Sequence, residues 1–331
     1  LNTTAVGITQ TGGQCRASNY YPVIRKALVD AGFANVPVIS AAMSSNVRSN
    51  QPGFKLDFKN IAVIAFDAIL FGDCLSKLYH STAVRIENPS LALELKNQYL
   101  QKAKPIVLEK DRKGLIALLK NAVKEFNKLL PEEYLERKKV GIVGEIFLKF
   151  HPFANQNIVA WLMSQKIEVI PPTLTPFMTQ FFVNRDSKLE NNVDTSSIPN
   201  PIMKLLYVLV KKEIAKFNNI ISKFKYYSPI EDIYELADEV KNIIPLIAQF
   251  GEGWVLPAEI VSLARNKADG VISLQPFGCI ANHIISKGVE NKIKQLYPDL
   301  SLLSLDFDSG VSEVNVVNRL MLLKDSMSKK A

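Results

Sequence analysis

The chain has 331 residues, of which 47% are hydrophobic and 22% are charged, so its composition excludes a disordered or fibrous chain and leaves room for two domains. The formal net charge of +8 is compatible with an anionic partner. The lysines are scattered along amphipathic helical patterns, however, and no RNA-binding or recognition-helix motif accompanies them. Solvated helix faces are therefore favoured over a nucleic-acid surface.

Three further properties bear on the compartment. No apolar run is long enough to span a bilayer, because Lys204, Lys211 and Lys212 interrupt the most apolar helical stretch. The first residues lack the basic and apolar regions of a secretory signal. Three cysteines in a chain of this length do not form a disulfide framework. We expect a cytoplasmic protein with neither a membrane nor a nucleic acid as partner.

Residues 1–133 predict an N-terminal α/β lobe that is rich in helices. Residues 4–8 and 36–39 are predicted strands on either side of a helix over 19–31, which makes a βαβ unit and begins a parallel sheet. No further strand follows, and a two-stranded parallel sheet is not expected to be stable alone. Together with the absence of an initiator Met, this indicates a fragment or a processed product. Helical spacing of apolar residues predicts helices over 58–79, 89–101 and 112–130.

Residues 134–331 predict a C-terminal α/β lobe with a helical insertion at about 173–250. The expected fold class is therefore α/β, with two flavodoxin-like lobes of parallel sheet and extra helices, the first lobe being incomplete. Strands are expected at 139–145, 168–170, 270–274 and 300–305. Helices are expected at 157–165, 177–183, 199–223, 230–249, 256–266, 284–296 and 312–327.

Two cysteines occupy matched positions between a strand and a helix. Cys15 lies in the polar, glycine-bearing loop 9–18, and Cys279 lies in the segment 275–283. Ligands of open α/β folds bind at the carboxyl ends of strands, and a helix N-terminus favours the thiolate form of a cysteine. If the two lobes face each other, both sulfurs project into one cleft, which suits a soft metal or an iron–sulfur cluster. Inert thiols and a catalytic cysteine are the alternatives.

Carboxylates and one histidine lie near the same corners. Glu145, Glu252 and Glu313 fall at loop–helix junctions, where they could be acid/base groups or partners of the helix dipole. His283 lies one helical turn after Cys279 and could donate a hydrogen bond to a sulfide or a substrate, or cap the helix. Glu145, Glu252 and His283 are our candidates for catalytic residues.

Several other residues have plainer interpretations. Cys74 falls within a helical pattern and is expected in a core, and His80 and His151 are expected to be structural or exposed. Loop 9–14 matches neither glycine pattern of nucleotide-binding loops. No close pair of cysteines or of cysteine and histidine supports a zinc site.

Four segments resemble the C-terminal half of large proteins known as acyl-CoA dehydratase activase-related or CoA-substrate-specific enzyme activase proteins. That half is in turn similar to the 2-hydroxyacyl-CoA dehydratase subunits of the 2-hydroxyglutaryl-CoA dehydratase D-component type, and to double-cubane cluster proteins. The resemblance runs through nearly all of the chain. The segments are VGITQTGGQCRASNY (6–20), QFGEGW (249–254), QPFGCIANH (275–283) and DFDSGVSEVN (306–315).

The resemblance implies an iron–sulfur cluster, of the [4Fe-4S] or double-cubane type, held in the cleft between flavodoxin-like lobes with Cys15 and Cys279 as ligands. It also implies low-potential electron transfer for acyl-CoA dehydration in anaerobic metabolism. A separate ATP-dependent activator module would drive the transfer, and an acyl-CoA would be the substrate of the lyase reaction.

The chain departs from the family in two ways. The actin-like nucleotide-binding domains of the activases are absent, so this chain is not expected to hydrolyse ATP. The preceding region of the family is also absent, and with it the expected further cysteines and strands. Two cysteines are too few for the usual cubane set, so an incomplete or lost cluster is expected as well. The alternative function is a non-catalytic scaffold or sensor of the same fold that docks a partner without a cluster.

Overall fold

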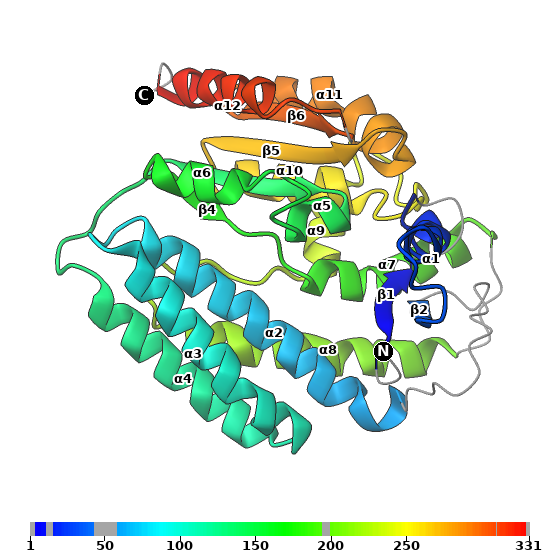
Figure 1. Ribbon diagram of the computed structural model, residues 1–331, viewed down its shortest axis with the longest axis horizontal. Coiled ribbons are helices and arrows are strands. Elements are labelled where there is room, and N and C mark those ends of the chain that lie inside the picture. Colours follow the sequence, from blue (N-terminus) through cyan, green and yellow to red (C-terminus); the bar gives the residue numbers. More distant parts are fainter. Residues whose placement is uncertain (1–3, 11–15, 43–57, 194–198, 309, 329–331) are drawn as a thin grey trace.

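A computed structural model describes residues 4–10, 16–42, 58–193, 199–308 and 310–328 (Figure 1). Its strands form two parallel sheets, one of two strands and one of four, and many helices surround them. The expected α/β class with parallel sheets is therefore confirmed. Among the helices that the structure describes, none is both long and apolar enough to cross a membrane.

The smaller sheet pairs β1 (Val6–Gln10) with β2 (Val38–Ala42) in parallel. The described part of the connection between them begins with a short 3-10 turn, η1 (Arg16–Asn19). The helix α1 (Tyr20–Asp30) follows this turn directly. Gly32 follows α1 with φ of +82°, a left-handed conformation that commonly ends helices. The predicted βαβ unit is thus present, with each strand shifted by about two residues along the chain.

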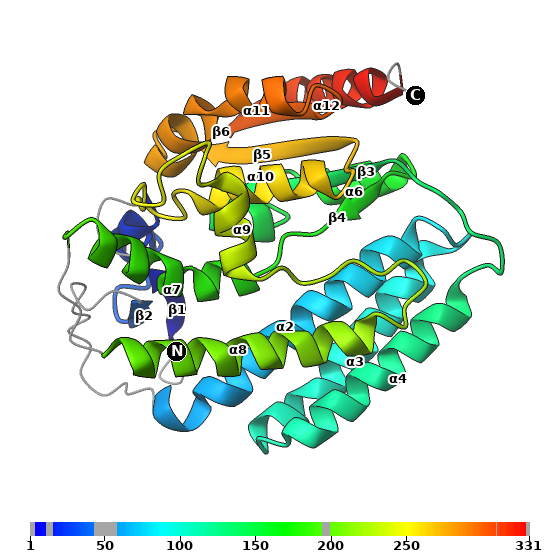
Figure 2. The ribbon, with the colours of Figure 1, turned by 180° about the vertical axis from the view of Figure 1, so that it is seen from behind.

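Four long helices form a bundle beside the larger sheet (Figure 2). α2 (Phe58–Ala83), α3 (Pro89–Leu108) and α4 (Arg112–Leu129) share one apolar core with α8 (Asn200–Ile221). Cys74 is completely buried in this core, as expected from its helical pattern. Because α8 belongs to the C-terminal region, the packing of the bundle crosses the boundary that the sequence suggests near residue 133.

The larger sheet has the strand order β4-β3-β5-β6. The chain runs from β3 outward to β4 and then returns to add β5 on the other side of β3. This reversal makes the space between the carboxyl ends of β3 and β5 the topological switch point, where open α/β sheets bind ligands. The strands are β3 (Lys139–Gly144), β4 (Glu168–Ile170), β5 (Gly270–Pro276) and β6 (Ser301–Phe307).

Helices cover both faces of this sheet. Alternate residues of each strand point to opposite faces, so each face has its own apolar core to bury. Ile142 of β3 joins one apolar core, and its neighbour Val143 joins the other. The first face carries α5 (Ile146–Phe150), α6 (Ile158–Ser164) and α12 (Glu313–Ser328). The second face carries α9 (Ile233–Val240), α10 (Val255–Arg265), η2 (Ala281–Ser286) and α11 (Glu290–Leu296).

Several helices differ from the sequence prediction. α5 was not predicted, and α3 extends to Leu108 rather than to residue 101. The helix predicted over 230–249 ends at Val240, in keeping with Pro245, which cannot donate a backbone hydrogen bond and disfavours helix before it. The helix predicted over 284–296 is divided into the π-helical turn η2 and α11. In contrast, α7 (Thr175–Glu190) is longer than the predicted 177–183.

Candidate functional site

The candidate site lies where β3 and β5 end side by side, and this place is called the corner below. Gly144, the last residue of β3, pairs with Leu274 and has φ of +125°. A Cβ atom at position 144 would lie 2.0 Å from the Leu274 carbonyl oxygen, so only glycine allows this close approach. Glu145 follows immediately, and its backbone N–H donates to the same carbonyl at 2.9 Å. The strand pairing therefore directs Glu145 and the Cys279 turn to one edge of the sheet.

Cys279 is buried, with 1% of its surface exposed. Its Sγ accepts a hydrogen bond from Asn282 Nδ2 at 3.1 Å. Burial raises the pKa of the thiol, the Asn282 hydrogen bond opposes this effect, and the nearby carboxylates of Glu252 and Glu145 add to it. The expectation that the helix start would favour the thiolate is therefore wrong. Loss of hydration and two neighbouring acids outweigh the short turn η2 that follows.

Glu145 is fully buried and is the N-cap of α5. Its Oε2 accepts the backbone N–H of Leu148 at 3.0 Å, and its Oε1 accepts the Tyr20 hydroxyl at 3.1 Å. Burial raises the pKa of its carboxyl, although these hydrogen bonds oppose the shift. Of the two roles that the sequence suggests for Glu145, the structure shows the helix-terminal one, and the charge of this carboxyl also acts on Cys279.

Glu252 is the second buried carboxyl of the corner, with 1% of its surface exposed. Burial raises its pKa to about 7, with Lys149 lowering it and Glu145 raising it further. Near neutral pH this group therefore gains and loses a proton readily, as an acid/base group must. The glycines on either side of Glu252 give no sign that the folded protein buries this carboxyl, so the shift of its pKa could not be predicted from the sequence.

Two charged residues that sequence reasoning missed complete the corner. Lys149 of α5 has 1% of its side chain exposed, and its Nζ lies 3.3 Å from Glu259 Oε2 of α10. Each stands alone in an apolar helical run, IFLKF and VLPAEIVSL. A lone charge in such a run must be paired when buried, which is the signal that could have identified both residues.

Several buried polar atoms of the corner lack a hydrogen-bond partner among the residues that the structure describes. They are Glu252 Oε1, Gln275 Nε2 and Asn282 Oδ1. An unsatisfied buried donor or acceptor costs about 1–3 kcal/mol, so such atoms are rare in stable cores. Asn282 contacts the Cys279 thiol, Glu252 acts on its charge, and Gln275 lies in the strand that leads to it. Unsatisfied atoms gathered around this turn indicate a site for a bound polar group or ordered water.

His283 does not contact the thiol. Its Nε2 lies 2.9 Å from Asp306 Oδ1, and its Nδ1 lies 3.2 Å from the backbone oxygen of Cys279. The imidazole is therefore held between β6 and the Cys279 turn, and it is not positioned as a base for Sγ. Glu313 lies in the first turn of α12, where its charge complements the helix dipole.

Cys15 lies outside the described residues, but the segment after it contacts the corner. Ala17 in η1 is buried, and the Tyr20 hydroxyl reaches Glu145. The Tyr20 ring also lies 5.6 Å from the ring of Phe147 in α5. Figure 1 shows α1 beside the end of the larger sheet at which α5 begins. The helix that follows Cys15 is therefore a neighbour of Glu145, which lies at the same edge of the sheet as the Cys279 turn.

The described part of the chain holds no group of three or more His, Cys, Asp or Glu side chains arranged to bind a metal ion. Comparison with known proteins adds no further evidence, since no family model, curated protein or solved structure matches the chain.

Proposed function

We propose that this chain is a redox module that takes part in low-potential electron transfer and binds an iron–sulfur cluster through cysteine thiolates. The cluster would lie at the carboxyl ends of β3 and β5, with Cys279 and Cys15 as ligands. The observation that carries the proposal is the hydrogen bond from Tyr20 to Glu145, because it brings the segment following Cys15 against the corner of Cys279.

The surroundings of Cys279 fit part of a cluster site. The Asn282 amide donates to Sγ, and N–H donors to sulfur are one way in which proteins stabilise bound clusters. The Gln275 amide offers a second buried N–H group without a partner in the described residues. Cys279 supplies one thiolate and Cys15 a second. The remaining ligands would come from another polypeptide segment, which the family resemblance implies.

Each residue of the corner has a role in this proposal. When bound, the cluster supplies one-electron chemistry at low potential. Cys279 would hold it through Sγ, and the Asn282 amide, which donates to that sulfur, would orient it. Glu252, whose pKa is raised to about 7, holds a proton beside the site at neutral pH. An ATP-dependent activator module would be the electron donor, and a 2-hydroxyacyl-CoA would be the acceptor that loses water.

Anaerobic reconstitution with iron and sulfide tests the proposal. Bound iron, acid-labile sulfide and the electron paramagnetic resonance signal after reduction should all fall at least several-fold in Cys279→Ala and Cys15→Ala. Cys74→Ala is the matched control, since Cys74 is buried in the helical bundle, and it should retain the signal. A wild-type chain that binds neither iron nor sulfide, even in the presence of the segment that would supply the remaining ligands, would contradict the proposal and favour the non-catalytic scaffold.

A further inference from the structure

A cavity of about 240 Å³ lies between the helical bundle and the larger sheet. Lys77 and Ser81 of α2 line one side of it, and the segment 225–231 lines another. Val143 and Leu263 supply apolar surface from β3 and α10. A single water molecule needs only roughly 10–15 Å³ of such space. The cavity is therefore large enough to hold a small organic molecule.

Lys77 is the buried amine of this cavity. Only 9% of the residue is exposed, and its Nζ donates to the Ser228 hydroxyl at 3.3 Å. Moving an ammonium group from water into such surroundings costs far more than moving a neutral amine. Burial therefore lowers the pKa of Lys77. As a result, more of this amine is uncharged near neutral pH than of a lysine in water.

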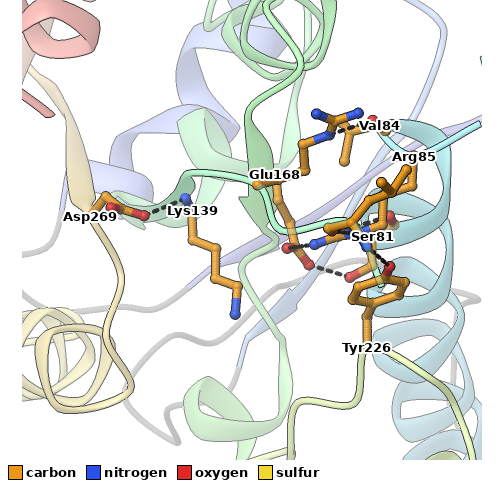
Figure 3. A network of polar contacts seen from close by, with 9 residues as sticks. Ser81, Val84, Arg85, Lys139, Glu168, Tyr226 and Asp269 are labelled. Carbon is orange, nitrogen blue, oxygen red and sulfur yellow. Dashed lines mark hydrogen bonds and ion pairs between the residues drawn. The ribbon is translucent and has the colours of Figure 1, made fainter. Parts of the chain in front are cut away.

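Four acidic groups near Lys77 oppose this shift, and burial outweighs them. Burial also raises the pKa of Asp73 and of Cys74, and it raises that of Glu231 to about 7, so these groups carry less negative charge than acids in water. The fourth group, Glu168, is paired with Arg85 at 2.6 Å, as Figure 3 shows. The four are Glu231, Asp73, Cys74 and Glu168.

The other described lysines of the cavity wall differ from Lys77. The Nζ of Lys225 donates to the backbone oxygens of residues 131–133 at 2.8, 2.6 and 2.9 Å, which uses the three donors of an ammonium group. Lys139 is half-exposed, so water solvates its charge. An ammonium group has no lone pair with which to attack a carbon atom. Of these three lysines, Lys77 is therefore the one suited to act as a nucleophile.

Glu231 lines the same cavity, and its charge acts on the Lys77 amine. Its Oε1 accepts hydrogen bonds from the neutral side chains of Ser262 and Asn266. With a pKa raised to about 7, its carboxyl holds a proton in a large fraction of molecules at neutral pH. Such a group can donate that proton to a departing hydroxyl. The cavity wall therefore supplies both an amine and an acid.

We propose that Lys77 is a nucleophilic lysine whose Nζ condenses with a short aliphatic aldehyde bound in this cavity. The neutral amine adds to the carbonyl carbon, and the resulting carbinolamine loses water to give an imine. Glu231 protonates the departing hydroxyl and recovers a proton from the nitrogen, so both amine protons leave with the oxygen as water. Val143 and Leu263 favour an alkyl chain on the aldehyde. This reaction is independent of the cluster at Cys279, because it needs neither iron nor a thiolate.

Reductive trapping in the full wild-type chain tests the proposal. Butyraldehyde with cyanoborohydride converts an imine into a stable butylated lysine, which peptide mass spectrometry locates. At pH 7 the initial rate at Lys77 should exceed that of exposed lysines at least about ten-fold. From pH 7 to 9 the neutral fraction of an exposed lysine rises about 100-fold, and the rate at Lys77 should rise much less. An unmodified Lys77, or one whose rate rises in parallel with the exposed lysines, would overturn the proposal.

Lys96 separates the effect of the cavity from that of a lowered pKa alone. Burial lowers the pKa of Lys96 too, but this lysine belongs to α3, where its Nζ lies 4.8 Å from the centre of the Tyr79 ring, and it is not among the residues that line the cavity. Its modification at pH 7 should therefore be clearly slower than that of Lys77. Equal rates at the two lysines would contradict a site built for an aldehyde.

Glu231→Gln tests the role of the acid. The variant should slow the modification of Lys77 at least about ten-fold at pH 7, because it removes the proton donor. Removing a nearby negative charge would by itself lower the pKa of Lys77 further and speed the reaction. A faster or unchanged rate would therefore refute the acid role of Glu231. Glu133→Gln on the surface is the control and should leave the rate unchanged.

Discussion

Tyr20 of α1 donates a hydrogen bond to Glu145 at the end of β3, at 3.1 Å and across 125 positions of the sequence. The same tyrosine ring lies against Phe147 of α5. Because α1 buries none of its own side chains, contacts at its first turn have a large share in holding it against the larger sheet. The position of α1 beside the end of β3 depends on this attachment.

Tyr20→Phe should loosen this attachment while keeping the ring contact. The loss of one hydrogen bond to a buried carboxyl is expected to cost about 1–3 kcal/mol locally. Hydrogen–deuterium exchange followed by mass spectrometry should therefore show faster exchange of the α1 amides. Tyr21→Phe changes the next residue in the same way and serves as the control. Equal exchange in the two variants would show that the Tyr20 hydroxyl does not hold α1.

Glu252 should make the stability of the protein depend on pH. Its pKa rises from 4.5 to about 7 on folding, so the folded state binds more protons between these values. Stability is therefore highest at low pH within this window and is lost as the pH rises through about 7. The groups that act on its charge are Lys149, Glu145 and Glu259, and the thiol of Cys279 also lies near it.

Glu252→Gln removes this titration. The variant should gain stability relative to the wild type as the pH rises from 5 to 8, by an amount on the order of 3 kcal/mol. Urea unfolding at both pH values measures the difference. Glu231, with a pKa also raised to about 7, acts in the same direction and leaves part of the slope. Glu133→Gln on the surface is the control, and the same gain there would refute the assignment.

The buried ion pair of Arg85 and Glu168 joins the turn after α2 to β4 (Figure 3). The Arg85 side chain is fully buried, and its guanidinium lies 3.7 Å above the Tyr226 ring. Arg85→Met should destabilise the protein by about 3–5 kcal/mol, because it leaves a buried carboxylate without its partner. A denaturation midpoint measured by circular dichroism would record the loss.

A double-mutant cycle isolates the pair from other effects. The double variant Arg85→Met with Glu168→Gln should lose less stability than the two single variants lose together. The reason is that Glu168→Gln removes the carboxylate charge that Arg85→Met leaves unpaired. The half-exposed pair of Lys138 and Asp269 provides a comparison, and Lys138→Ala should cost at most about 1 kcal/mol. Additive effects in the cycle would contradict a direct interaction.

Two glycines should respond to alanine in opposite directions. Gly144→Ala combines a positive φ with a clash against the Leu274 carbonyl, so a loss of about 3 kcal/mol or more is expected. Gly72 lies within α2, and a Cβ there meets nothing within 4 Å. Gly72→Ala should therefore stabilise the protein by about 0.5–1 kcal/mol. Thermal unfolding distinguishes these outcomes, and a neutral Gly144→Ala would disprove the close approach of β3 and β5.

Local sequence signals predicted most elements well. The strand at Glu168–Ile170 lies where expected, because an apolar run ends there at two consecutive prolines. The helices of the bundle were also predicted, since their apolar residues recur with a helical period. The helix predicted over 230–249 was wrong in its length. The apolar residues keep a helical period past Val240, but the backbone leaves the helical conformation there, ahead of Pro245.

The sequence by itself determined which segments become strands and helices, and it placed Cys279 and Glu145 at the ends of strands, because these features depend on periodicity and on nearby glycine and proline. The tertiary structure decided which ends meet. The order β4-β3-β5-β6 puts β3 beside β5, and so brings Glu145, Glu252 and Cys279 together. Burial then reverses the expected thiolate preference, because desolvation and charge pairing depend on neighbours far apart in the chain.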